Sequence, residues 1–286
     1  MTGPDTGPDT GPDTGPDTGP DKAFTGSIPR FYEEYFVPLI FEPYAVDLAN
    51  RVAARPVTRV LEIAAGTGVA TRHLASALPD SVSIIATDLN QSMLDLAAET
   101  GTSRPVQWGR ADATDLPFRD GEFDAVVCQF GFMFPPDKVA AFAEAHRVLG
   151  PGGALFFNVW DRIEDNEFAD VITRSLEAVF PDDPPRFLAR TPHGYHDVGV
   201  IERDLRAAGF ATTPEVTTLT ERSRADSARV PAIAFCLGSP LRNEIEDRDA
   251  ARLDDATDVA EAAILREFGA GAVDGKIQAH VVVVER

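Results

Sequence analysis

The chain is predicted to fold as an α/β protein built on a doubly wound, mostly parallel sheet of seven strands. From residue 59 to residue 160, strand-like apolar runs alternate with helical patterns. A turn of small residues with two glycines, Ala64 to Gly68, follows the first run. Acidic residues then follow the next two runs, Asp88 and Asp112. Alternation of this kind places helices on both faces of a parallel sheet, with polar groups at the strand ends.

The seven strand patterns are residues 59–63, 83–87, 106–109, 125–129, 154–160, 215–219 and 277–284. Apolar residues at helical spacing predict helices over residues 69–78, 91–98, 138–149 and 198–208. Gly150-Pro151-Gly152-Gly153 is a strong stop for the third of these helices, because glycine and proline do not continue a helix.

Three further segments complete the domain organisation. Residues 1–22 are predicted to be a disordered tail, because Thr2 to Asp21 are five Thr-Gly-Pro-Asp repeats without an apolar side chain. The tail is either a partner-binding or solubilising arm or a tolerated terminal expansion. Residues 23–286 form one domain, with an N-terminal helical segment at 28–55. Helical patterns at 225–269 predict an insertion before the last strand, which would form a lid over the strand ends.

Composition restricts the class of protein. The 286 residues are 44% hydrophobic and carry a formal net charge of −20. Only Cys128 and Cys236 are present, so neither a disulfide framework nor a metal site is predicted. Nucleic acid is not an expected partner, since no Lys/Arg cluster appears to replace phosphate counterions. No secretory pattern and no run of about 18 apolar residues occurs, so a cytoplasmic protein without membrane insertion is expected. Oligomeric state is left open.

Three carboxylates are the candidate ligand-binding groups. Glu62 lies inside an apolar strand and requires a designated partner, because an unpaired buried carboxylate is costly. Asp88 comes 88 − 62 = 26 residues later, at a strand end where an acid can accept both hydroxyls of a ribose. Asp112 comes 112 − 88 = 24 residues after that, where an adenine amino group could donate to it. Asp88 can alternatively begin a helix as its cap.

In five motifs the chain resembles the class I S-adenosylmethionine-dependent methyltransferases, in the broad family related to the ubiquinone/menaquinone-biosynthesis methyltransferases. The motifs span about a hundred residues, Arg59 to Trp160. They are Val60-Leu61-Glu62-Ile63-Ala64-Ala65-Gly66-Thr67-Gly68, Ala86-Thr87-Asp88-Leu89, Ala111-Asp112-Ala113-Thr114-Asp115-Leu116-Pro117-Phe118, Phe123-Asp124-Ala125-Val126 and Arg147-Val148-Leu149-Gly150-Pro151-Gly152-Gly153. The resemblance implies a Rossmann-like methyltransferase fold and S-adenosylmethionine as the methyl donor.

The resemblance also implies nine cofactor-binding positions: Glu62, Ala64, Gly66, Gly68, Asp88, Leu89, Asp112, Ala113 and Gln129. Glu62 and the two glycines would shape the pocket for the methionine part. Asp88 would bind the ribose, and Leu89, Asp112 and the Ala113 amide would surround the adenine. Gln129 would border the methionine amino group and the transferring methyl. Ala64 departs from the family's usual glycine, which matters only if this position requires a positive φ.

The implied activity is methyl transfer to a small-molecule acceptor by in-line displacement, with an apolar or aromatic acceptor favoured by the acidic chain. No catalytic base is assigned. The candidates are Tyr32, Tyr35, His193, Tyr195 and His196. A helix cap is the better explanation of His196-Asp197, and His146 fits a helix face turned to the core. Phe130, Phe132 and Phe134 line an acceptor pocket or pack a loop onto the core.

Two other functions stay open at this point. A nicotinamide-dependent oxidoreductase also places an acid after its second strand, but it normally carries a G-x-G-x-x-G turn, which residues 64–69 lack. A non-catalytic nucleoside-binding protein of the same fold would be favoured if the lid filled the pocket.

Overall fold

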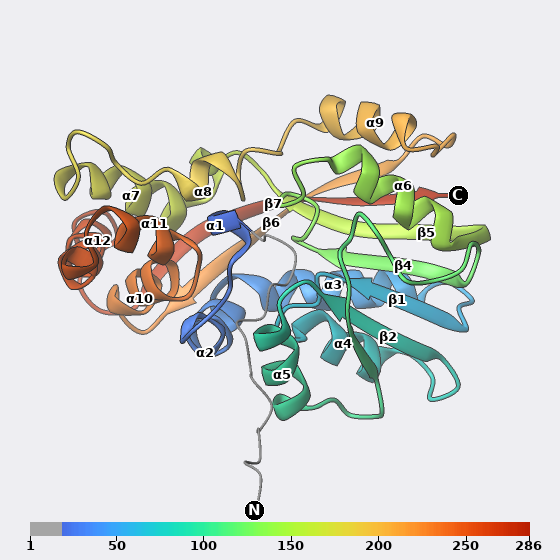
Figure 1. Ribbon diagram of the computed structural model, residues 1–286. Coiled ribbons are helices and arrows are strands. Elements are labelled where there is room, and N and C mark those ends of the chain that lie inside the picture. The colour runs from blue at the N-terminus through green and yellow to red at the C-terminus, as the bar shows by residue number, and fades with distance from the viewer. Residues whose placement is uncertain (1–18) are drawn as a thin grey trace, which may run out of the picture.

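The computed structural model describes residues 19–286 and shows one sheet with strand order β3-β2-β1-β4-β5-β7-β6 (Figure 1). The strands are β1 (Arg59–Ile63), β2 (Ser83–Asp88), β3 (Gln107–Arg110), β4 (Phe123–Gln129), β5 (Leu149–Trp160), β6 (Glu215–Ala225) and β7 (Val273–Glu285). The first five strands pair in parallel, whereas β7 runs antiparallel to both β5 and β6. The predicted mostly parallel sheet of seven strands is confirmed.

Helices cover both faces of this sheet. They are α3 (Glu42–Ala53), α4 (Val69–Ala77), α5 (Gln91–Thr100), α6 (Lys138–Val148) and α9 (Val198–Ala207). The side chain of Val60 joins a core with α3 and α4, whereas that of Leu61 joins the opposite core with α6 and α9. Successive side chains of a strand point to opposite faces, so β1 supplies both cores.

The helix before β5 ends at Val148, as the glycine-rich stop predicts, but the strand begins at Leu149 rather than at Ala154. Phe123 pairs with Leu149 and Ala125 with Ala154, so five residues of β5 are set against two of β4. The extra residues bulge out of the ladder, and Gly152 has a φ of +79° within this bulge. The glycines therefore allow the bulge at the start of β5.

The N-terminal segment forms α1 (Gly19–Lys22), α2 (Ile28–Phe31) and the π-helix η1 (Tyr32–Phe41), which leads into α3. The N–H of Glu42 donates to the carbonyl of Val37, five residues earlier. Such π-helical turns are rare and are frequently found at functional sites. The predicted repeat tail lies outside the described residues, apart from residues 19–22, which form α1.

A block of helices gathers around the far end of the β6–β7 ribbon, at the left of Figure 1. It contains α7 (Glu167–Ser175), α8 (Phe187–Arg190), α10 (Arg229–Leu237), α11 (Leu241–Asp249) and α12 (Leu253–Phe268). The last three lie between β6 and β7, inside the predicted insertion at 225–269. Strand β7 pairs with β5 only from Ala279 onward, whereas its pairing with β6 starts at Val273. The ribbon therefore projects beyond β5, and the helices cover the projecting part.

The turn after β1 has a left-handed backbone at three positions, with φ 56° at Ala64, 58° at Gly66 and 85° at Gly68. The N–H of Ala65 donates to Thr87 O, and the N–H of Gly68 donates to Ala65 O, each at 2.9 Å. Glycine enters this region without steric cost, whereas alanine pays roughly 1–2 kcal/mol. Position 64 does require a positive φ, so its alanine is held in a strained conformation.

We expect Ala64→Gly to raise the free energy of unfolding by about 0.5–1 kcal/mol, because relief of the left-handed strain exceeds the entropic cost of glycine. Urea unfolding checks this. The matched control is Ala65→Gly, at a neighbouring position without a positive φ, which should lose about 0.5–1 kcal/mol. Equal losses of stability in both variants would contradict the assignment of strain to Ala64.

Candidate active site

A cavity opens where the carboxyl ends of β1, β2 and β4 meet, and we call it the sheet-edge cavity. It encloses about 740 Å³ of empty space that communicates with solvent, within the range of about 300–1,000 Å³ typical of small-molecule sites. Its wall is formed by Lys22, Phe24, Tyr32, Ile63, Ala64, Gly66, Asp88, Leu89, Asn90, Met93, Ala111, Asp112, Ala113, Gln129, Phe130, Gly131, Phe134 and Pro135. Seven of the nine predicted cofactor positions are thus brought together.

Asp88 is the buried carboxylate of this wall. Its Oδ2 accepts from the Gly66 N–H and its Oδ1 from the Asn90 N–H, both at 2.8 Å. Burial raises the pKa of the carboxyl in spite of these bonds. The side chain is therefore oriented by backbone donors at the ends of β1 and β2, and its remaining lone pairs can accept from a ligand hydroxyl.

Asp112 is a second polar residue of the wall. Its Oδ1 accepts from both the N–H and the hydroxyl of Thr114, at 2.8 and 2.7 Å. No protein donor within residues 19–286 is bound to its Oδ2. The residue is therefore turned so that one oxygen is fixed by Thr114, while the other is available to a ligand amino group.

Two predicted positions do not lie on the wall, Glu62 and Gly68. The side chain of Glu62 shares the face of β1 with that of Val60, which α4 covers, and its Oε2 accepts from the Thr71 hydroxyl at 2.6 Å. Burial raises the pKa of Glu62 to about 8. A Cβ at Gly68 would come within 2.9 Å of the Trp108 ring. Glu62 therefore connects β1 to α4, and Gly68 allows the turn to pack closely against Trp108.

Gln129 ends β4 and completes the wall. Its Nε2 donates to Phe41 O at 3.3 Å. Its Oε1 is buried and has no hydrogen-bond partner among the described residues. A buried acceptor without a partner costs about 1–3 kcal/mol, so a cationic or amino group of a ligand would be stabilised here.

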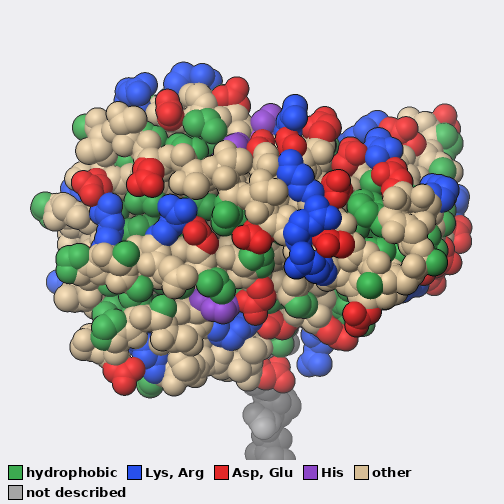
Figure 2. Space-filling view, turned by 180° about the vertical axis from the view of Figure 1, so that it is seen from behind, with side chains coloured by type: hydrophobic (Ala, Val, Ile, Leu, Met, Phe, Trp, Pro, Cys, Tyr) green, Lys and Arg blue, Asp and Glu red, His purple; other side chains and the backbone are tan. Residues whose placement is uncertain are grey.

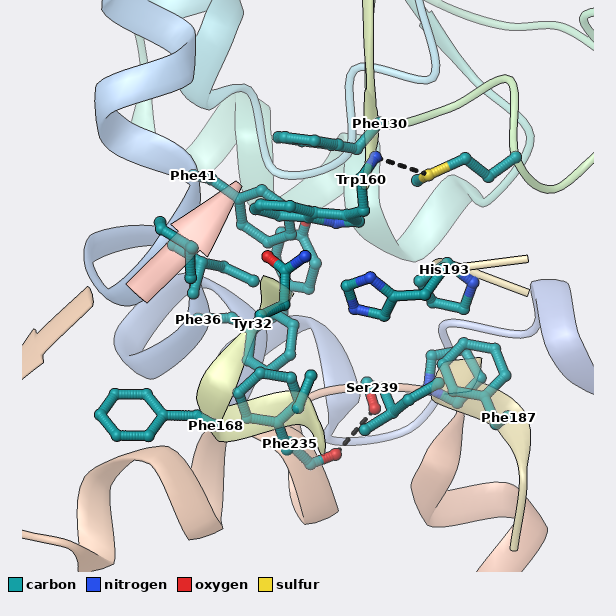
Figure 3. A pocket seen from close by; sticks show the side chains of 18 of the residues that line it. Tyr32, Phe36, Phe41, Phe130, Trp160, Phe168, Phe187, His193, Phe235 and Ser239 are labelled. Atoms are coloured by element: carbon teal, nitrogen blue, oxygen red, sulfur yellow. Dashed lines mark hydrogen bonds between the residues drawn. The ribbon is translucent and has the colours of Figure 1, made fainter. Parts of the chain in front are cut away.

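A second cavity adjoins the first, and we call it the aromatic cavity (Figure 3). It encloses about 650 Å³ of empty space. Its wall is formed by Phe24, Tyr32, Phe36, Ile40, Phe41, Phe130, Met133, Phe134, Trp160, Asn166, Phe168, Ala169, Phe187, Leu188, Pro192, His193, Phe235, Ser239, Pro240 and Ile277. Phe130 and Trp160 stack with 3.8 Å between ring centroids. Four aromatic residues belong to both walls: Phe24, Tyr32, Phe130 and Phe134.

Residues 21–27 form a strap that joins the helices on either side of the two cavities. The Phe24 N–H donates to Asn90 Oδ1 at 3.3 Å, and the Ser92 hydroxyl donates to Phe24 O at 2.7 Å. On the other side, Asn243 Nδ2 donates to Ala23 O at 3.0 Å. Asp21, the last residue of the repeat, pairs with Arg190 at 2.7 Å. The strap thereby holds the ring of Phe24 in the wall shared by both cavities.

The candidate bases fall into two groups. Tyr32 and His193 lie on the wall of the aromatic cavity, and Tyr32 also lines the sheet-edge cavity. Tyr35, Tyr195 and His196 lie outside both walls, and Asp197 caps α9 by accepting from the Val200 N–H at 3.0 Å. Burial, with the charge of Asp88 next in size, raises the pKa of Tyr32 far above its usual range, so its hydroxyl stays protonated.

The predicted phenylalanines divide in the same way. Phe130 and Phe134 line the cavities, whereas Phe132 packs in the core, with its ring centroid 4.4 Å from that of Phe142. His146 also packs against a ring, that of Phe210. Most of the aromatic wall comes from segments that no motif marks, among them α7, α8 and α10. Only the tertiary structure shows that these segments line one cavity.

Two broad features concern other partners. Within residues 19–286, no cluster of three or more His, Cys, Asp or Glu side chains has the arrangement of a metal site. No helix in this part of the chain has both the length and the apolar character that crossing a bilayer requires.

Comparison with known proteins identifies relatives of the chain. The family described as "Methyltransferase domain" matches residues 60–153. The ubiquinone/menaquinone biosynthesis C-methyltransferase UbiE of Teredinibacter turnerae is 31% identical over 185 residues, covering 60% of this chain and 73% of that protein. UbiE of Cupriavidus metallidurans is 34% identical over 185 residues, with the same coverage of 60% and 73%.

Solved structures show the same fold. Phosphoethanolamine N-methyltransferase 2 of Haemonchus contortus, in complex with phosphomonomethylethanolamine and S-adenosylhomocysteine, has a TM-score of 0.56 at 17% identity, covering 93% of this chain and 59% of that chain. The YcgJ protein of Bacillus subtilis has a TM-score of 0.54 at 18% identity, covering 85% and 98%.

The raised pKa of Glu62 predicts how stability depends on pH. Its folded pKa of about 8 exceeds the ordinary value of 4.5, so the folded state binds the proton more tightly. The contribution to stability is complete below pH 4.5 and is lost as the pH rises to about 8, with a slope of up to about 1.4 kcal/mol per pH unit. Glu62→Gln, which keeps an acceptor for Thr71, should flatten this slope in urea titrations without cofactor. An unchanged slope would contradict the prediction.

Proposed function

Since the chain belongs to the UbiE-like family of class I S-adenosylmethionine-dependent methyltransferases, we propose that it methylates an apolar small molecule bound in the aromatic cavity. S-adenosylmethionine is the methyl donor of this family. The observation that carries the proposal is the shared wall of Phe24, Tyr32, Phe130 and Phe134. It joins a cavity with carboxylates and amides to one lined almost entirely by apolar side chains.

The polar groups of the sheet-edge cavity match the polar groups of the methyl donor. In this proposal Asp88 accepts from the ribose hydroxyls, and Asp112 with the Ala113 amide binds the edge of the adenine beside Leu89. The buried Oε1 of Gln129 supplies the acceptor that the methionine ammonium requires. Ala64 and Gly66 let the ligand approach the backbone, since even a Cβ at Gly66 would have no atom nearer than 3.6 Å.

When bound, the cofactor would supply a methyl group activated by a positively charged sulfonium sulfur, which is a good leaving group. The chain contributes mainly alignment and exclusion of water. The aromatic rings of η1, β5 and the helical block surround the acceptor. Phe235, Ser239 and Pro240 bring the predicted insertion into this wall, as a lid would. A protonated Tyr32 can donate a hydrogen bond but cannot act as a base at neutral pH.

The alternative functions have less support. The turn at residues 64–69 lacks the nicotinamide motif, and both the matching family and the two UbiE relatives are described as methyltransferases. The helical block leaves an open aromatic cavity, so the condition that would favour a non-catalytic protein is not met. Figure 2 shows Lys and Arg side chains interspersed with carboxylates on the face it displays. This mixture supports a small-molecule acceptor rather than a polyanion.

A thermal-shift experiment tests the donor. S-adenosylmethionine and S-adenosylhomocysteine at a hundred times their dissociation constants should each stabilise the protein by about 2.7 kcal/mol. NAD serves as the control ligand and should give no shift. Stabilisation by NAD alone would overturn the proposed function. A screen of metabolite pools with labelled methyl groups then identifies the acceptor.

Asp112 provides a test of adenine recognition. In Asp112→Asn, the N–H and hydroxyl of Thr114 should still donate to the side-chain oxygen, as they do to Asp112 Oδ1. The new NH₂ group then takes the place of Oδ2 and faces the ligand. We expect S-adenosylhomocysteine to bind about 10- to 100-fold more weakly, and S-inosylhomocysteine, which offers a carbonyl instead of the amino group, to lose much less. Calorimetry measures both. Asp115→Asn, at an exposed neighbour off the wall, is the control. Equal losses for both ligands would argue against this contact.

A further inference from the structure

His193 presents a ring edge to the aromatic cavity, on the loop between α8 and α9. The backbone N–H of His193 donates to Leu188 O at 3.0 Å, and the side chain of His193 is buried. In Figure 3 the imidazole extends from one side toward the middle of the cavity, near the ring of Trp160. The two ring centroids are 6.0 Å apart. The loop therefore places an imidazole ring in a wall formed mainly by apolar and aromatic side chains.

The hydrogen bond of this ring defines its tautomer. Nδ1 lies 2.8 Å from the backbone carbonyl oxygen of Asp161. A carbonyl can only accept, so Nδ1 carries the proton and donates. Burial lowers the pKa of His193 to about 4, which keeps the ring neutral at pH 7. Nε2 consequently has a lone pair and no proton.

Two other polar side chains of the wall, Asn166 and Ser239, have hydrogen-bond partners within the protein. Asn166 Nδ2 donates to Asp161 O at 3.3 Å, and its Oδ1 accepts from the Gln278 N–H at 3.0 Å. The Ser239 hydroxyl donates to Phe235 O at 2.7 Å. Among residues 19–286, no protein group is bound to His193 Nε2, to the indole N–H of Trp160 or to the Tyr32 hydroxyl. Nε2 alone of these three accepts without donating.

We propose that His193 determines acceptor specificity by accepting, at Nε2, a hydrogen bond from a hydroxyl or N–H group on a ring-bearing, otherwise apolar acceptor. This inference rests on the proposed function, because it assigns the acceptor to the aromatic cavity. Apolar contacts discriminate weakly between ligands, whereas a buried acceptor left unpaired penalises a ligand that lacks the donor. A purely structural role would require only Nδ1, which holds the loop to the end of β5.

The test compares p-cresol with toluene, which differ by one hydroxyl group, by calorimetry on protein saturated with S-adenosylhomocysteine. The quantity measured is the ratio of their dissociation constants, so that general changes in the cavity cancel. His193→Asn keeps a donor for Asp161 O, and His193→Phe keeps a ring; both lack an acceptor at the Nε2 position. We expect each variant to reduce the preference for p-cresol about 3- to 10-fold, the effect of one net hydrogen bond.

The control is His196→Asn, on the same loop but outside both walls, which should keep the wild-type ratio. A ratio unchanged within twofold in a folded His193 variant would overturn the inference, as would failure of both probes to bind the wild-type protein. Binding of S-adenosylhomocysteine separates the two proposals. If it binds and the ratio does not change, only the role of His193 fails; if neither sulfur nucleoside binds, the proposed function fails as well.

Discussion

The hydrogen bond from the Gly66 N–H to the buried carboxylate of Asp88, 2.8 Å long, connects the ends of two neighbouring strands. The carboxylate is tolerated in its buried position because backbone donors from both strand ends bind it. The turn that presents the Gly66 N–H has a left-handed backbone at three positions. The shape of the sheet-edge cavity therefore depends on a few backbone angles at least as much as on its side chains.

The same edge of the sheet also contributes residues to the wall of the aromatic cavity. Trp160 ends β5, and its ring stacks on Phe130, which follows β4 and is itself left-handed with φ 52°. The Phe130 N–H is held by the Asn158 side chain at 2.9 Å. Two adjacent parallel strands thus place Phe130 in the wall shared by both cavities and Trp160 in the wall of the aromatic cavity. The π-helix η1 and the strap add Tyr32 and Phe24 from the N-terminal side.

Asp161, the residue after β5, links the histidine loop to this framework. Its carbonyl binds His193 Nδ1, and its carboxylate accepts from Gln278 of β7 at 2.7 Å and from the Arg162 N–H at 2.7 Å. His280 of β7 approaches the same carboxylate at 3.3 Å. Asp161 thereby connects the His193 ring to β7, the strand that pairs antiparallel with β5.

The order of strands and helices, the turn after β1 and the polar residues at the strand ends follow from local patterns: apolar alternation, small residues and spacing. Seven of the nine predicted positions therefore lie on one wall. Glu62 is behind it because the strand's alternation turns its side chain toward α4, which the motif alone does not reveal. The sequence offered Phe130 and Phe134 as candidates for an acceptor pocket. The rest of the aromatic cavity could not be predicted, since its wall comes from segments between residues 24 and 277 whose contact no spacing in the chain indicates. Periodicity and steric limits act between neighbours in sequence, so the sequence alone determined the fold class, and its motifs indicated the donor through their resemblance to the methyltransferase family. Packing of distant helices on the β6–β7 ribbon decided where the aromatic cavity, the proposed acceptor site, lies and that His193 lines it.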